Sequence, residues 1–177
     1  MQNGILVFFS SYQQLKSHRI CYQNNPQLKF SRPLFFESRK NKTEKTWRAF
    51  KTAAQRKPGA VLFCVFRGKF SEGFDFKNEL CRLTVIIGVP YQNLQSPKIQ
   101  SKQFYHKSSP ARFREYYLRD AMTKVNQGIG RVRRHRADFG GVLLVDGRYA
   151  EEKYRGELNG YVRQLMQQPG SWKDALK

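Results

Sequence analysis

Five short apolar runs, separated by stretches with helical patterning, constrain the fold of this chain more than any other feature. The runs are continuous rather than alternating, and they cover residues 5–9, 34–36, 61–66, 85–89 and 142–145. Continuous runs of this length are typical of strands that are covered on both faces of a parallel sheet. Helical patterning lies between several of them, at residues 12–20, 42–55 and 113–134. This alternation predicts βαβ crossovers and a three-layer α/β domain with a mainly parallel sheet.

The length of the chain is that of one domain. Its 177 residues are 40% hydrophobic and can bury one ordinary core. We expect residues 1–150 to form the α/β domain and residues 151–177 to be a helical extension of it, with helices at 158–167 and 172–176. The polar stretch 92–110 predicts a long loop, or a loop broken by a short helix. The first apolar run begins within a few residues of Met1, so we expect the chain to be a piece of a larger protein.

The charge of the chain indicates a polyanionic partner. It carries 33 Lys plus Arg against 13 Asp plus Glu, a formal net charge of +20. Such a surplus repels itself unless a polyanion neutralises part of it, which favours nucleic acid, with a membrane surface as the second candidate. No apolar run approaches the roughly 20 residues of a spanning helix, and no basic segment precedes the apolar start. We therefore expect a soluble, intracellular protein.

The cysteines and histidines support neither a disulfide framework nor a metal site. The three cysteines are widely spaced, form no CxxC pair and have no histidine at a zinc-ligand interval. Cys64 lies inside an apolar run, where we expect it to be a small core residue.

The run NQGIGRVRRHR is the most informative stretch of the sequence. On a helix, Gln127, Arg131 and Arg134 fall at positions i, i+4 and i+7 and share one face. Arginine is permanently charged and grips phosphate oxygens with two hydrogen bonds, so two arginines one turn apart can stabilise charge that grows during phosphoryl transfer. Gly128 and Gly130 would each cost a helix about 1 kcal/mol, which indicates a close approach to the backbone. A basic run alone also fits a solvated face or a localisation signal.

A second informative stretch, VFRGKFSEGFDF, comprises the end of an apolar run and the charged loop that follows it. A strand that runs into such a loop places Glu72 and Asp75 at the carboxyl edge of a parallel sheet, where α/β folds build their sites. The alternative is that both residues only form a turn and cap a short helix.

These stretches resemble motifs of the XPD-like superfamily 2 helicases. QxxGRxxR is similar to motif VI, RGKFSEGFDF to motif V, and GILVFFSSYQQL at 4–15 to motif IV. GVPYQ at 88–92 and LLVDGRY at 143–149 are similar to the turn after the fourth strand and to the closing strand. The tail with Trp172 is similar to the Fanconi anaemia group J and telomere-elongation-regulator branch. Phe74 stands where the family usually has an aliphatic residue, a change that we expect to affect packing more than chemistry.

The resemblance implies a RecA-like fold and the second motor domain of an ATP-dependent 5′ to 3′ DNA helicase. It assigns catalysis to Arg131 and Arg134, as arginine fingers, and to Gln127. Nucleotide sensing falls to Glu72, Gly73, Asp75 and Gly130. Contacts with nucleic acid fall to Ser10, Ser11, Arg67, Lys69, Ser71 and Tyr91.

The sequence contains no GxxxxGK[ST] loop, no acidic box for magnesium and no cluster of four cysteines. The resemblance therefore implies that ATP and Mg²⁺ are shared with an N-terminal motor domain outside this chain, and that a 4Fe–4S cluster belongs to that part. We expect the chain alone to be inactive as an ATPase. The other implied properties are a monomeric state, a nuclear or otherwise cytoplasmic location, and single-stranded or forked DNA as partner.

A motor that moves along any sequence must hold phosphates, with base stacking as a supplement. The stretch around residues 91–116 interleaves two sets of side chains suited to this: Lys98, Lys102, Lys107, Arg112 and Arg114 with Tyr91, Phe104, Tyr105, Phe113 and Tyr116. As a group they predict a groove lining, although any one aromatic can belong to the core. Two other functions stay open: a non-enzymatic basic module that binds RNA or DNA, in which Gln127, Arg131 and Glu72 are dispensable, and a protein-interaction domain.

Overall fold

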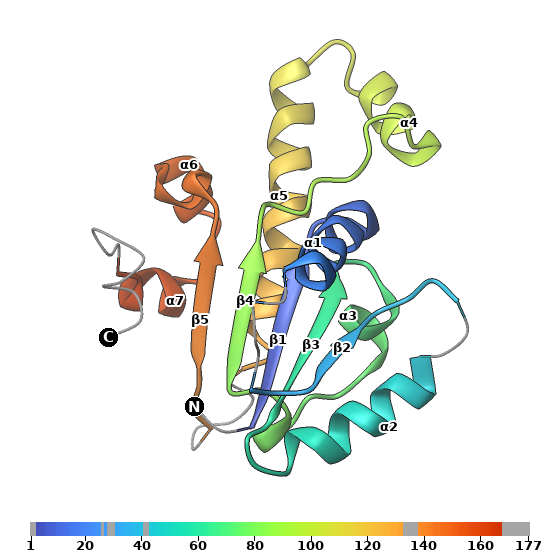
Figure 1. The fold of residues 1–177 in the computed structure, drawn as a ribbon. Coiled ribbons are helices and arrows are strands. Elements are labelled where there is room, and N and C mark those ends of the chain that lie inside the picture. Colours follow the sequence, from blue (N-terminus) through green and yellow to red (C-terminus); the bar gives the residue numbers. More distant parts are fainter. Residues whose placement is uncertain (1–2, 26, 28–30, 41–42, 133–137, 168–177) are drawn as a thin grey trace.

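The computed structural model describes residues 3–25, 27, 31–40, 43–132 and 138–167, and it contains a five-stranded sheet (Figure 1). The strands are β1 (Gly4–Phe9), β2 (Leu34–Phe36), β3 (Ala60–Val65), β4 (Leu83–Ile87) and β5 (Gly141–Val145). They lie in the order β2-β3-β1-β4-β5, and every neighbouring pair is parallel. The five predicted strands and the α/β class are confirmed.

Side chains of the central strands alternate between two hydrophobic clusters, one on each face of the sheet. Phe9 and Phe63 pack with Leu15 of helix α1 (Tyr12–Asn24) on one face. On the other face, Phe8 and Leu62 belong to a cluster that includes buried residues of α2 (Thr43–Ala54), α3 (Lys69–Gly73) and the second half of α5 (Pro110–Ile129). Burial on both faces explains why these strands read as continuous apolar runs.

The polar stretch 92–110 contains a short helix, α4 (Pro97–Tyr105), and the start of α5, which confirms the second form of the prediction. Proline occupies the first turn of both helices, where its missing N–H leaves no hydrogen bond unmade. In Figure 1, α4 and the first turns of α5 extend beyond the carboxyl ends of the strands.

Helix α5 ends earlier than the sequence predicts. A helix was expected to continue through residue 134, but α5 stops at Ile129, and Gly130 is its C-cap. Arg131 therefore lies in a turn, and its backbone N–H bonds to Gly128 O as in a tightened last turn. The expected helical face shared by Gln127 and Arg131 is wrong, because the glycine pair ends the helix between them. Arg134 lies outside the described residues.

Within the described residues, three short helices follow β5: η2 (Gly147–Ala150), α6 (Glu152–Arg155) and α7 (Gly160–Leu165). The sequence predicted one helix at 158–167, so α7 is shorter than expected and α6 was missed. Tyr154 and Leu158 are buried in the main cluster, so this segment packs on the same core. The predicted division at residue 150 stays a prediction, and the expected helix at 172–176 lies outside the described residues.

Two smaller features complete the described part of the chain. A 3₁₀ turn, η1 (Asn78–Leu80), precedes β4, and Cys64 is fully buried, as expected. Among the helices of the described ranges, none has both the length and the apolar character that crossing a membrane requires.

Candidate nucleotide and nucleic-acid site

All five strands are parallel, so the segments that follow them meet at one edge of the sheet. Gly88, after β4, has a φ of +79°, and a Cβ atom there would lie 3.7 Å from Ser10 Oγ and 3.9 Å from Asp146 Oδ2. The ends of β1, β4 and β5 are thus close together.

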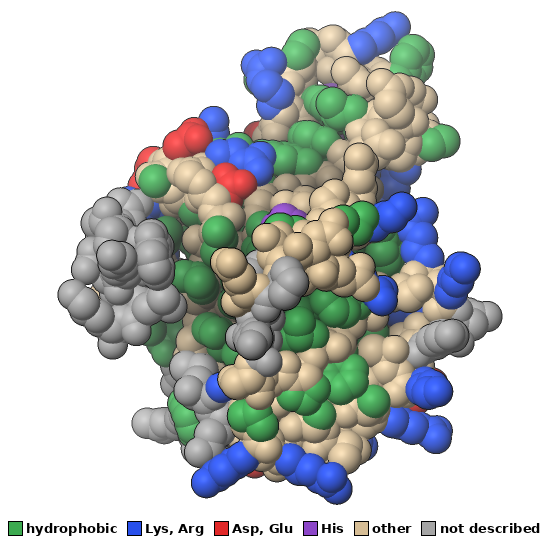
Figure 2. Space-filling model, viewed as in Figure 1, with side chains coloured by type: hydrophobic (Ala, Val, Ile, Leu, Met, Phe, Trp, Pro, Cys, Tyr) green, Lys and Arg blue, Asp and Glu red, His purple; other side chains and the backbone are tan. Residues whose placement is uncertain are grey.

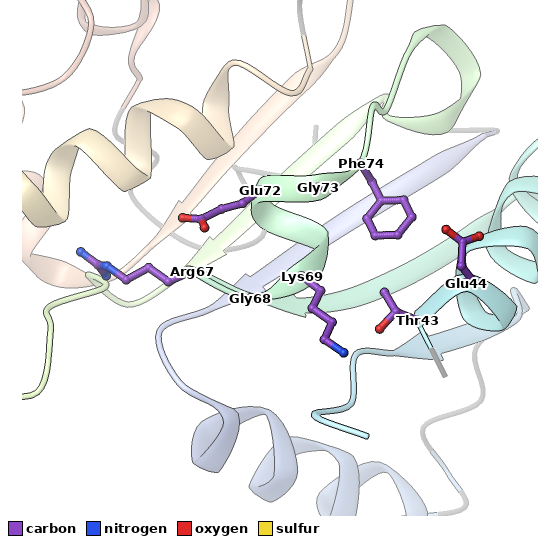
Figure 3. A pocket seen from close by; sticks show the side chains of 8 residues that line it. All are labelled: Thr43, Glu44, Arg67, Gly68, Lys69, Glu72, Gly73 and Phe74. Carbon is purple, nitrogen blue, oxygen red and sulfur yellow. The ribbon is translucent and has the colours of Figure 1, made fainter. Parts of the chain in front are cut away.

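The loop after β3 and helix α3 borders an open cavity of about 700 Å³ (Figure 3). The residues that line it are Thr43, Glu44, Arg67, Gly68, Lys69, Glu72, Gly73 and Phe74. Figure 3 shows Lys69 and Phe74 facing the start of α2 across this space. Phe74, the departure from the family pattern, packs on Trp47 at 5.0 Å between ring centroids, as expected for a change that affects packing.

A second cavity, of about 490 Å³, joins the two most informative stretches of the sequence. Its lining residues are Ser71, Glu72, Lys124, Gln127, Gly130 and Arg131. Lys124 Nζ donates to Glu72 Oε1 at 2.8 Å, and this hydrogen bond lowers the pKa of Glu72. Acidic, amide and guanidinium groups therefore surround one space that a polar, charged ligand can enter.

The guanidinium of Arg131 is bound to the backbone of the neighbouring stretch. Its Nη1 donates to Phe74 O at 2.5 Å, and its Nη2 donates to Ser71 O. The guanidinium also lies 5.9 Å from the ring centroid of Phe76. Arg131 thus connects the turn after α5 to helix α3, through Ser71, and to the residue that follows this helix, Phe74.

Arg67, a predicted nucleic-acid contact, also has partners within the chain. It has a φ of +60°, donates to Pro90 O at 2.6 Å and forms an ion pair with Asp120 of α5. Gln92 donates to the same carboxylate at 2.9 Å. This network fixes the loop after β4 against the loop after β3.

The sequence reasoning missed Asp120, which connects α5 to the loop after β3, and Lys124, which connects α5 to helix α3. Asp120, Lys124 and Gln127 fall at positions i, i+4 and i+7 of α5 and therefore share one face of the helix. That spacing is a signal that could have identified them.

Tyr91 and the closing strand form a separate polar cluster. Arg148 donates to both carboxylate oxygens of Asp146, at 2.8 and 2.7 Å, and these hydrogen bonds lower the pKa of Asp146. The same guanidinium lies 5.8 Å from the centroid of Tyr91, whose hydroxyl donates to Tyr154 Oη at 3.1 Å. Tyr91 also stacks on Tyr117 at 4.8 Å, so much of its ring is used for packing.

The remaining predicted residues have simpler surroundings. Ser10 Oγ donates to Gln14 Oε1 at 2.8 Å, and Ser11 Oγ caps α1 by accepting from Gln14 N at 3.2 Å. Asp75 forms an ion pair with Lys77 at 2.9 Å. A Cβ atom at Gly73 would meet no atom of the described chain within 4 Å. In the described ranges, no group of three or more His, Cys, Asp and Glu side chains is placed to hold a metal ion.

Comparison with known proteins identifies the family. The profile of the helicase C-terminal domain family matches residues 1–165 of the chain. The chain belongs to this family. Its relatives among curated proteins include the regulator of telomere elongation helicase 1 homologs of Drosophila yakuba and Drosophila melanogaster, each 36% identical over 171 residues. Those alignments cover 91% of this helicase C-terminal domain and 17% of each relative.

Solved structures agree with this assignment. The apo XPD structure is 25% identical with a TM-score of 0.65, and the match covers 88% of this helicase domain and 30% of that chain. The structure of S. tokodaii Xpd4 has a TM-score of 0.56 at 21% identity, covering 90% and 30% of the two chains, and supports the fold alone. The RecA-like fold and the likeness to XPD-like superfamily 2 helicases are therefore confirmed.

Proposed function

We propose that this chain is the C-terminal motor half of an ATP-dependent DNA helicase and completes an ATPase site whose other half lies outside it. The observation that carries the proposal is the shared cavity, in which Glu72 and Ser71 of the motif V stretch meet Gln127 and Arg131 of the motif VI stretch. These residues lie more than 50 positions apart in the sequence, and an ATPase built from two motor domains needs such a polar surface on the second one.

The proposal gives each predicted site residue a distinct task. ATP with Mg²⁺ would supply the phosphoryl group and the metal charge from the first motor domain. Arg131 and Arg134 stabilise the negative charge of the transferred phosphate, and Gln127 orients the reacting groups. Glu72, Gly73, Asp75 and Gly130 sense the nucleotide.

The contacts of Arg131 suggest how nucleotide and DNA are coupled. Its guanidinium holds the carbonyls of Ser71 and Phe74, in the loop that we propose to contact DNA through Lys69 and Ser71. An arginine that turns toward a phosphate changes its hydrogen bonds to this loop. Nucleotide state is thereby transmitted to the DNA-binding segment.

The proposed DNA surface combines the loops at the carboxyl edge with the projecting helices. Figure 2 shows Lys and Arg side chains around the tip of α4 and α5, whereas acidic side chains gather on α6. Phe104 and Tyr105 are 72% and 78% exposed at this tip, which fits stacking on unpaired bases. Phe113 is buried and belongs to the core.

Family likeness extends the proposal to the whole protein. We infer 5′ to 3′ polarity, a nuclear location, monomeric action on single-stranded or forked DNA, and a 4Fe–4S cluster in the first motor half.

The test is DNA-stimulated ATP hydrolysis by the longest product that contains this chain, with its Arg131→Ala variant. We expect the variant to lose about 10³-fold or more in turnover, a far larger effect than any loss of affinity for single-stranded DNA that follows from releasing the loop. Arg56→Ala, which removes the same charge from an exposed position just after α2, is the matched control. Unchanged hydrolysis in Arg131→Ala would refute the finger role. DNA binding without hydrolysis by any product would support the non-enzymatic module instead.

A further inference from the structure

Glu37 is a buried carboxylate that none of the recognised motifs contains. It follows the edge strand β2 directly and is only 5% exposed. Three donors converge on it: Val65 N bonds to Oε2 at 2.8 Å, Lys69 N to Oε1 at 2.7 Å, and the Tyr12 hydroxyl to Oε1 at 2.8 Å. A buried carboxylate with three donors is a specific arrangement, because burial without them would be strongly unfavourable.

The two backbone donors belong to the motif V segment. Val65 ends β3 and Lys69 begins α3, so one side chain binds both ends of the turn between them. A Cβ atom at Gly68 would lie 2.3 Å from Glu37 Oε1, so the glycine provides the space that the carboxylate occupies. Glu37 thereby sets where the motif V loop leaves the sheet.

The third donor belongs to the motif IV segment. Tyr12 is the first residue of α1 and follows Ser11 directly, so its hydroxyl ties the Ser10–Ser11 turn to the same carboxylate. Burial and the bond to Glu37 raise the pKa of Tyr12, which further favours the protonated phenol as a hydrogen-bond donor. The guanidinium of Arg39 lies over the Tyr12 ring, 4.7 Å from its centroid.

We propose that Glu37 is a positioning residue. It fixes the Ser10–Ser11 turn and the motif V loop relative to each other, so that both bind the same nucleic-acid backbone. The inference rests on the proposed function, in which these two segments contact DNA. A carboxylate suits the task because it offers acceptors only, whereas a glutamine would direct an NH₂ group at one of the three donors.

The experiment compares Glu37→Gln, Tyr12→Phe and Glu79→Gln with the wild type, in the longest product that contains this chain. Glu79 is exposed on η1, at the amino end of the sheet, so its variant removes the same charge without touching either segment. Affinity for single-stranded DNA is measured over a range of salt, together with the DNA concentration that half-saturates ATP hydrolysis. Thermal unfolding of each variant shows that it is folded at the assay temperature.

We expect Glu37→Gln to weaken DNA binding about tenfold, the equivalent of one misplaced charged group. Its salt slope should fall by about 0.7 for each phosphate that the protein no longer neutralises. The half-saturating DNA concentration should rise while turnover at saturating DNA is retained, a split that a general decrease in stability does not produce. Tyr12→Phe should change the affinity for DNA and the half-saturating DNA concentration in the same direction but by less. Glu79→Gln should change neither of them.

Three results would overturn the proposal. A folded Glu37→Gln protein with unchanged affinity and salt slope would show that the carboxylate only stabilises the fold. If Glu37→Gln does not fold, Tyr12→Phe decides, and wild-type binding in that variant would refute the link between the two segments. A wild type that does not bind single-stranded DNA would refute the proposed function as well, and that result differs from the first two because it appears before any substitution.

Discussion

Asp146 shows how a single ion pair at the residue scale makes stability depend on pH. Arg148 lowers the pKa of Asp146 in the folded chain, so this pair contributes stability above the unfolded pKa of about 4, and the contribution is lost as pH falls through the folded pKa. We expect Asp146→Asn to lower the free energy of unfolding by about 1–2 kcal/mol near neutral pH. Urea denaturation from about pH 7 to about pH 3 should show the difference from the wild type shrinking. A constant difference would contradict the assignment.

Motif spacing and the family resemblance identified Arg67 and Arg131 as arginines that can meet phosphate, but they did not show the partners of these side chains. Arg67 binds Asp120, 53 positions away, and Arg131 binds Ser71 O, 60 positions away. Such partners depend on how the helices pack on the sheet, which no local pattern reports. The predicted contacts with DNA and nucleotide stay predictions.

At the scale of elements, the two glycines at the end of α5 differ in their surroundings. A Cβ atom at Gly128 would come within 3.1 Å of Phe66 and 3.4 Å of Ile86, because the helix lies close to the sheet there. A Cβ atom at Gly130 would meet only ordinary contacts, at 3.4 Å or more, within the described chain. The sequence predicted that another group lies close to the backbone at these glycines. At Gly128 that group is the hydrophobic core, through Phe66 and Ile86.

This difference predicts unequal losses of stability for two alanine substitutions. Gly128→Ala should destabilise the fold by about 1–2 kcal/mol, because overpacking outweighs the gain of about 1 kcal/mol in helix propensity. Gly130→Ala should leave stability within about 0.5 kcal/mol of the wild type. Chemical denaturation measures both. A drop in ATP hydrolysis for Gly130→Ala in the longest product, without loss of stability, would indicate that nucleotide approaches this backbone; equal destabilisation by both substitutions would contradict the packing argument.

The elements themselves were largely predictable. The five strands follow from apolar runs, a property of short segments, and each lies within a few residues of its predicted place. The end of α5 was not predictable from periodicity, because Gly128 and Gly130 were assigned to a continuing helix and the helix stops at Ile129. Short helices such as α6 carry too few residues for a periodic signal.

At the scale of the whole molecule, the net charge of +20 indicates that DNA binding depends on salt concentration. The salt dependence can therefore distinguish the contribution of the basic side chains from that of the exposed aromatic side chains. Stacking on a base is worth about 1–3 kcal/mol and involves no counterions. We therefore expect Phe104→Ala combined with Tyr105→Ala to weaken binding of single-stranded DNA about tenfold or more without changing the salt slope. Lys102→Ala should instead reduce the slope by about 0.7.

Fluorescence titration of a labelled oligonucleotide at several salt concentrations measures both effects. Tyr161→Ala is the control, since Tyr161 is 51% exposed on α7, away from this tip. If the double variant keeps full affinity for DNA, the exposed tip serves another purpose, such as contact with the remainder of the protein.

The sequence by itself determined the class, the parallel sheet and the family, because run length and motif spacing are properties of neighbouring residues. Only the tertiary structure decided which side chains meet. It joined Glu72 to Gln127 and Arg131 in one cavity, and it placed Glu37 between segments that lie 25 and 28 residues from it along the chain. The physical reason is that a parallel sheet brings the carboxyl ends of its strands to one edge, whereas the sequence keeps them tens of residues apart.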